Sequence, residues 1–168
     1  MRRRALLRSE LEHDRSMTIG TMLLASHDTS GARAAEAAGL DMTPKDLHHL
    51  VVVPDFWKGM KGDDWLNNAI TRDRFGSYVE NQLQREISEH MERLEKAAAK
   101  LGIAYSSEVL LGKPALCLLA VSAERNPDLV VIGAPRPKGI SGYRSRMALD
   151  ILTRGLKCPL QIIPHPGS

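Results

Sequence analysis

Aromatic residues and long apolar runs are scarce in this chain. Aromatic residues make up 4% of the 168 residues, so the core must be built mainly from Leu, Ile, Val, Ala and Met. The longest apolar run, Ala115 to Val121, is far shorter than the ~20 residues that a membrane-spanning helix requires. We therefore expect a single domain with one buried sheet and no membrane partner.

Cysteine and net charge are also low. Cys117 and Cys158 stand in no metal-binding or redox spacing, which excludes a disulfide framework or a zinc site built on cysteines and favours a reducing cytoplasm. The net charge is +3, an excess too small to indicate a nucleic-acid partner. The chain contains neither G-x4-G-K-[ST] nor G-x-G-x-x-G, so nothing supports a P-loop enzyme or a Rossmann dehydrogenase.

Basic residues gather at the beginning of the chain. Arginine occupies positions 2, 3, 4, 8 and 15, and no apolar segment of a secretory signal accompanies them. We expect residues 1–17 to form a flexible basic extension and residues 18–165 to form the domain. Met17 lies just before the first predicted strand, so it is an alternative start of translation to Met1.

Apolar runs bounded by turn residues predict five strands, at residues 21–26, 50–53, 104–111, 129–132 and 160–163. Helical spacing or composition predicts helices at 32–38, from Leu83 to Leu101, from Pro114 up to a break at Asn126-Pro127-Asp128, and at 147–154. Gly39, Gly102 and Gly155 are the expected helix stops. Residues 55–80 contain both tryptophans and both phenylalanines, and are read as an insertion in the second crossover that packs locally or forms a lid or partner surface.

The strands are apolar on both faces and alternate with helices, which is typical of a parallel sheet covered on both sides. We predict an α/β fold with a single-domain, doubly wound, open parallel five-stranded sheet, strand order 3-2-1-4-5, and helices on both faces. Ligands of such sheets bind outside the carboxyl ends of the strands, where the winding reverses. The loop with Asp28 and the loop that begins at Gly133 would then face one crevice.

Four short motifs carry a resemblance to a known family. They are Asp28-Thr29-Ser30, Gly112-Lys113-Pro114-Ala115, Asp128-Leu129-Val130-Val131-Ile132-Gly133 and Cys158-Pro159-Leu160. In this order and spacing the sequence resembles the universal stress proteins from about Thr21 to Pro164. The resemblance implies a stress-response protein, and the members that bind ATP use a loop of pattern G-x2-G-x9-G-[ST] after the fourth strand.

This chain departs from that pattern. Laid on the sequence without gaps, the loop begins at Gly133, but Arg136 and Arg146 replace the two later glycines and Met147 replaces the hydroxyl residue. Large side chains would crowd a backbone that must approach phosphate closely, so we expect no ATP binding in the family's usual manner. Arg136, Lys138, Arg144 and Arg146, with Gly139 among them, form either a basic rim that attracts an anion or a solvated loop.

Two further residues have alternative roles. The resemblance implies that Asp28 contacts nucleotide in the first loop and that Val53 lies near the adenine. Asp28 could instead cap the first helix, and Val53 could instead fill the sheet.

Two histidine patterns carry no chemistry by themselves. Consecutive residues of an extended chain point to opposite faces, so Ser26, His27 and Asp28 cannot align as a catalytic triad. The same alternation disfavours a metal site made of His48 and His49 alone. We therefore expect no catalytic residue and no metal site.

The final strand, Leu160 to Ile163, is an expected sheet edge, and family members commonly dimerise through it. We predict a homodimeric, non-catalytic stress-response module with an unidentified protein partner and no cofactor. The alternatives are a nucleotide-binding switch or weak ATPase that uses ATP in the Asp28 and Gly133 crevice, and a carrier of an anion on the basic rim.

Overall fold

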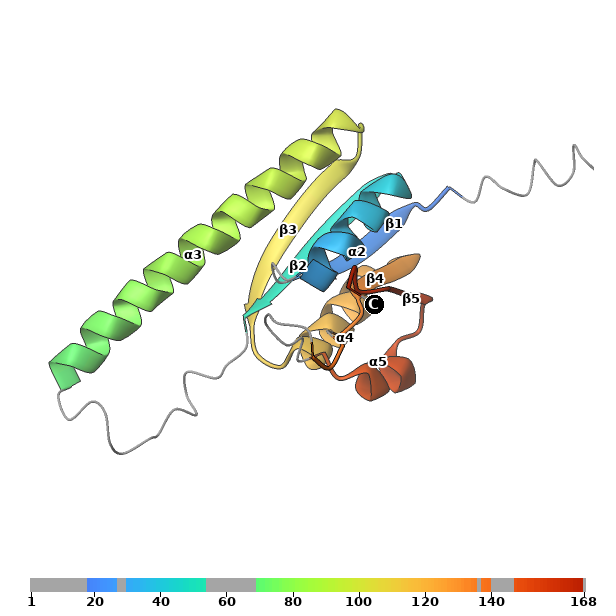
Figure 1. Ribbon diagram of the computed structural model, residues 1–168. Helices are drawn as coiled ribbons and strands as arrows, with labels where there is room; N and C mark the ends of the chain where they lie inside the picture. Colours follow the sequence, from blue (N-terminus) through green and yellow to red (C-terminus); the bar gives the residue numbers. More distant parts are fainter. Residues whose placement is uncertain (1–17, 27–29, 54–68, 136, 140–146, 168) are drawn as a thin grey trace, which may run out of the picture.

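Five parallel strands form one sheet in the order β3-β2-β1-β4-β5 (Figure 1). The computed structural model describes residues 18–26, 30–53, 69–135, 137–139 and 147–167, without the side chains of residues 30 and 69–83. The strands are β1 (Thr21–Ser26), β2 (Asp46–Val53), β3 (Ala104–Leu111), β4 (Leu129–Gly133) and β5 (Leu160–Ile163). The predicted fold class and strand order are confirmed.

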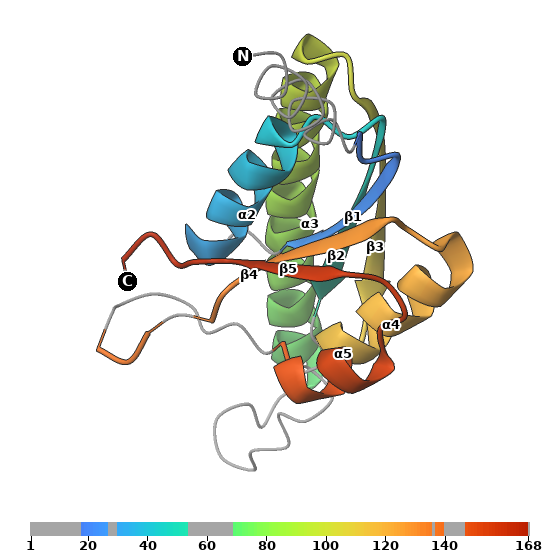
Figure 2. The ribbon, with the colours of Figure 1, turned by 90° about the vertical axis from the view of Figure 1, so that its right-hand side faces the viewer.

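In the described residues, four helices cover the two faces of the sheet. They are α2 (Ser30–Asp41), α3 (Ala69–Lys100), α4 (Pro114–Arg125) and α5 (Leu149–Gly155). Helices α2 and α3 lie on one face, and α4 and α5 lie on the other (Figure 2). The winding direction reverses between β1 and β4, which are neighbours with Ala25 opposite Ile132.

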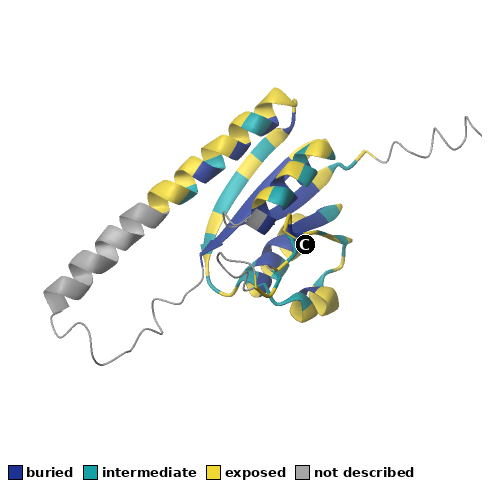
Figure 3. Cartoon of the chain, viewed as in Figure 1, coloured by how far each residue is buried: buried dark blue, intermediate teal, exposed yellow. Residues whose placement is uncertain are grey.

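The side chains of the central strands alternate between two cores. Met22 and Leu24 of β1 pack under α2 and α3, while Leu23 and Ala25 pack under α4 and α5. Figure 3 shows the central strands buried between the two helical layers. The sheet thus has two apolar faces, as the uninterrupted apolar runs of β1 and β4 indicate.

Several predicted boundaries are wrong by a few residues. Helix α2 continues through Gly39 to Asp41, because Gly39 is buried where its missing side chain leaves space for the sulfur of Met22. Strand β2 begins at Asp46, four residues before Leu50, because partners in the fold accept the polar side chains of His48 and His49. Helix α5 begins at Leu149 instead of Met147.

The second crossover also differs from expectation. Helix α3 begins at Ala69, so the last part of the predicted 55–80 insertion is helical, while residues 54–68 lie outside the described residues. Leu101, predicted on the apolar face of this helix, follows its end and is 52% exposed. Within the described parts of the chain, none of the helices combines the length and the apolar character needed to cross a bilayer.

Candidate functional site

The carboxyl ends of β1 and β4 meet at the point where the sheet reverses direction. Ser26 ends β1 and Gly133 ends β4, on strands paired in parallel. Val53 ends β2 at the same edge and is 8% exposed. The structure therefore brings Gly133 and Val53 to one edge, as the sequence predicts, while Asp28, Arg136, Arg144 and Arg146 lie outside the described residues.

Gly133 is in close contact with the first turn of α2. A Cβ atom on Gly133 would lie 2.3 Å from the carbonyl oxygen of Gly31 and 3.0 Å from the amide nitrogen of Ala32. A Cβ atom on Gly31 would in turn lie 2.9 Å from the carbonyl oxygen of Ala134. The two glycines let the helix pack directly on the strand end, so Gly133 has a packing role that requires no ligand.

The other predicted residues of the loop after β4 have distinct positions. Lys138 and Gly139 are exposed, and Gly139 has a φ of 87° with no atom near its missing Cβ. Met147 is half-buried and packs against the core cluster that contains Leu23 and Leu152. At the position of the family's hydroxyl residue, this chain therefore places a side chain that contributes to the core.

A group of buried polar side chains lies on the α2 and α3 side of the same strand ends. We call it the Glu36 cluster, and its members are Ser26, Glu36, His49, His90, Arg93 and Tyr105. They come from β1, α2, β2, α3 and β3. Ser26, Glu36, His49 and His90 are each at most 4% exposed. Since Ser26 ends β1, the cluster adjoins the strand-end crevice.

Hydrogen bonds connect the cluster in a chain. The guanidinium of Arg93 can only donate and lies 2.9 Å from His90 Nδ1, so the proton of neutral His90 is assigned to Nε2. His90 Nε2 then donates to Ser26 Oγ over 3.1 Å, and Ser26 donates to His49 Nε2 over 2.5 Å. His49 Nδ1 donates to the Tyr105 hydroxyl oxygen over 2.8 Å. One proton arrangement satisfies all four contacts.

Glu36 is ionised but incompletely satisfied. Its Oε2 accepts a hydrogen bond from Arg93 over 3.1 Å. Its Oε1 lies 2.9 Å from His90 Nε2, but this pair is not aligned as a hydrogen bond, and Oε1 has no other hydrogen-bond partner in the described residues. A buried polar atom without a hydrogen bond costs about 1–3 kcal/mol, and more when it is charged.

The surroundings set the protonation states. Burial favours a higher pKa for Glu36, but His90 and Arg93 outweigh it and hold the pKa below the usual range of a carboxyl. Burial lowers the pKa of His49 to about 4. Burial raises the pKa of Tyr105 to about 12. At neutral pH the cluster therefore holds a carboxylate, a neutral imidazole at His49 and an intact phenol.

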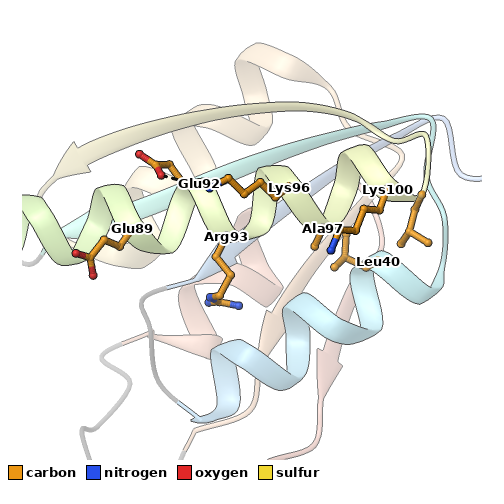
Figure 4. A pocket seen from close by; sticks show the side chains of 8 residues that line it. Leu40, Glu89, Glu92, Arg93, Lys96, Ala97 and Lys100 are labelled. Carbon is orange, nitrogen blue, oxygen red and sulfur yellow. Dashed lines mark ion pairs between the residues drawn. The ribbon is translucent and has the colours of Figure 1, made fainter.

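A groove between α2 and the end of α3 leads to Arg93. It has a volume of about 730 Å³ and is lined by Leu40, Glu89, Glu92, Arg93, Lys96, Ala97, Lys100 and Leu101. Figure 4 shows the Arg93 side chain pointing from α3 toward α2. The Arg93 side chain is 50% exposed, whereas that of Glu36 is 3% exposed. Arg93 thus connects the groove with the buried cluster.

His48 lies on the opposite face of the sheet from His49, as strand alternation predicts. His48 Nδ1 contacts Ser106 Oγ over 2.7 Å and its Nε2 contacts Glu108 over 2.6 Å. Arg125 of α4 lies 3.5 Å from the same carboxylate. The prediction that the two histidines do not bind one metal ion together agrees with this separation, but sequence reasoning missed the partners that His49 finds on α2 and α3.

Comparisons with known proteins identify the fold. No protein-family sequence model and no curated protein sequence matches the chain. The structure of universal stress protein UspA from Lactobacillus plantarum is 17% identical, with a TM-score of 0.63 over 88% of this chain and 99% of that one. A universal stress protein family member from Burkholderia pseudomallei is 16% identical, with a TM-score of 0.60 over 89% and 98%. An Arabidopsis thaliana family member with AMP bound is 12% identical, with a TM-score of 0.56 over 87% and 92%.

Proposed function

We propose that this chain, which has the universal stress protein fold, is a non-catalytic binding and interaction module of the stress response. The likeness in structure extends over nearly nine-tenths of the chain and supports this assignment. Among the described residues of the four short motifs that resemble the family, Ser30 begins α2, Pro114 begins α4, Leu129–Gly133 form β4 and Leu160 begins β5.

We also propose that the protein does not bind ATP in the family's usual manner, and the packing of Met147 is the main support for this. Met147 contributes to the core where nucleotide-binding members offer a hydroxyl to phosphate. Gly133, the glycine of the pattern that this chain retains, is required by the contact with Gly31. Arg136 and Arg146 stand at the other two glycine positions of the sequence. Little of a backbone cradle for phosphates remains.

Isothermal titration calorimetry of the full chain with MgATP, AMP and inorganic phosphate tests the proposal. We expect no binding, or weak binding of all three anions that is screened by added salt. Tight, magnesium-dependent ATP binding that Asp28→Ala abolishes would contradict the proposal. Asp41→Ala is the matched control, because Asp41 is an exposed carboxylate at the far end of α2.

A nucleotide-binding switch or weak ATPase is the second candidate. The AMP found in the Arabidopsis structure favours it, together with the location of Gly133 and Val53 at the strand edge where open α/β sheets bind ligands. This candidate requires Asp28 to contact the nucleotide and the loop after β4 to hold its phosphates through side chains instead of main-chain amides. Calorimetric binding of AMP that survives 0.5 M salt would support it.

We further propose that the protein is a cytoplasmic homodimer that pairs through β5. This strand forms one edge of the sheet, and Gln161 and Ile162 are exposed on it. An edge strand with an exposed apolar side chain offers unpaired backbone groups and apolar area to a second copy. An interface made by both copies of β5 would leave the crevice between β1 and β4 open to a protein partner.

A further inference from the structure

The Glu36 cluster contains the ligand set of a metal site. The candidate ligand atoms of Glu36, His49 and His90 all lie within 4.8 Å of one another. Two imidazole nitrogens with one carboxylate oxygen form a common protein ligand set for Zn²⁺, and they leave a fourth position open. A tetrahedral ion with bonds of about 2.1 Å separates its ligand atoms by about 3.4 Å, so small side-chain movements would complete the site.

The orientation of the donors supports an ion at this point. His49 Nε2 and His90 Nε2 both face Ser26 Oγ, at 2.5 and 3.1 Å. Glu36 Oε1 lies 2.9 Å from the same nitrogen of His90 and has no hydrogen bond within the described part of the chain. A cation among these atoms would bind this buried carboxylate oxygen directly, where it now has only the unaligned contact with His90 Nε2.

Arg93 supplies the positive charge beside Glu36 that a bound metal ion would otherwise supply. It donates to Glu36 Oε2 and to His90 Nδ1, and this second contact keeps the proton of His90 on Nε2. An ion on His90 Nε2 requires that proton to move to Nδ1, so Arg93 must leave Nδ1. Its half-exposed side chain lines the groove between α2 and α3, which gives it room to withdraw (Figure 4).

We propose that Glu36, His49 and His90 bind one divalent transition-metal ion, of which Zn²⁺ is the best fit, with the Ser26 hydroxyl or a water molecule as fourth ligand. The ion replaces Arg93 as the counter-charge of Glu36. Metal binding here does not require a nucleotide in the adjoining crevice. It connects β1, α2, β2 and α3, so metal binding would stabilise the fold directly.

Metal titration of the full-length protein tests the site. Protein treated with EDTA and then freed of chelator is titrated with Zn²⁺ by calorimetry, and with Co²⁺ by visible absorption, where tetrahedral Co²⁺ gives intense bands. We expect one equivalent of either ion to bind and the melting temperature to rise with Zn²⁺. Glu36→Gln and His90→Gln should each weaken the affinity at least 100-fold.

His48→Gln is the matched control, because His48 is also a buried histidine of β2 but faces the opposite side of the sheet. It should bind Zn²⁺ like the wild type, even if it is less stable. Arg93→Met should bind Zn²⁺ at least as tightly as the wild type, since it removes the competing cation. Circular dichroism of each variant before the titration separates lost binding from lost folding.

Three results would overturn the proposal. The first is no uptake of Zn²⁺ or Co²⁺ by the wild type at millimolar metal. The second is unchanged affinity in folded Glu36→Gln and His90→Gln, which would place the bound ion elsewhere. The third is loss of binding in folded Arg93→Met, which would make Arg93 a necessary part of the site instead of a competitor.

Discussion

Replacement of Gly133 by alanine tests whether this glycine serves packing or a ligand. The added Cβ would lie 2.3 Å from the Gly31 carbonyl oxygen and 2.4 Å from its carbonyl carbon, more than 1 Å inside the ~3.5 Å of ordinary contact. Both opposing atoms belong to the backbone, so no side chain can turn away. The first turn of α2 must move from β4.

We expect Gly133→Ala to lower the free energy of unfolding by about 3 kcal/mol, at the upper end of the cost of overpacking. For a chain of this length that corresponds to a fall in melting temperature of about 6–12 °C. Urea denaturation and calorimetry on protein free of nucleotide measure both quantities. The protein must be free of nucleotide because, if Gly133 served only to bind phosphate, its replacement by alanine would not change the stability of the unliganded protein.

Gly139→Ala is the control within the same loop. A Cβ on Gly139 would meet no atom within 4 Å, but its φ of 87° is unfavourable for alanine and costs about 1 kcal/mol. The two variants thus separate steric overlap from backbone strain. If Gly133→Ala lost less than about 1 kcal/mol, the close packing of α2 on β4 would not be the reason for a glycine here.

Three further predictions concern histidine, tyrosine and the sheet edge. The pKa of His49 is about 4 in the folded protein and 6.5 in the unfolded chain, so the unfolded chain binds more protons between these values and stability falls as the pH is lowered. Urea denaturation of EDTA-treated protein should show a loss of about 2 kcal/mol from pH 7 to pH 5 that His49→Gln reduces. Tyr105→Phe removes the hydroxyl that is hydrogen-bonded to His49 Nδ1, and should lower the free energy of unfolding by about 1 kcal/mol in the same assay. An unchanged free energy of unfolding would show that this hydrogen bond adds nothing to stability. Ile162→Lys on the exposed edge of β5 should halve the mass measured by light scattering at micromolar protein, whereas a wild type that already has the mass of one chain would refute dimerisation.

The fold could be predicted because the apolar pattern of the strands depends little on tertiary context. Strands β1, β3 and β5 have the predicted bounds. The predicted boundaries of helices and strands are wrong where tertiary contacts override local preference. Gly39 is tolerated in α2 because Met22 needs the space, and His48 and His49 extend β2 because each has polar partners in the fold.

The sequence contains a weaker indication of the Glu36 cluster, which the pattern of neighbouring residues alone does not reveal. His90 occupies the apolar stripe of α3, three residues after Ile87 and four before Leu94, and is 4% exposed. Glu36 likewise shares a face of α2 with Ala32 and is 2% exposed. A charged or titratable residue on each of two apolar helix faces indicates a buried partner, but the sequence does not say that both faces cover the same end of β2.

The adjacent histidines of β2 fix the alignment of this strand against its neighbours. A shift of one residue along β1 and β3 would turn His48 toward α2 and α3 and His49 toward α4. Ser26 and Tyr105 would lose their hydrogen bonds with His49, and Glu108 would lose its contact with His48. Purely apolar strands, by contrast, bury equally well in either alignment. The two buried histidines thus favour one register in a parallel sheet whose other central strands offer little discrimination between registers.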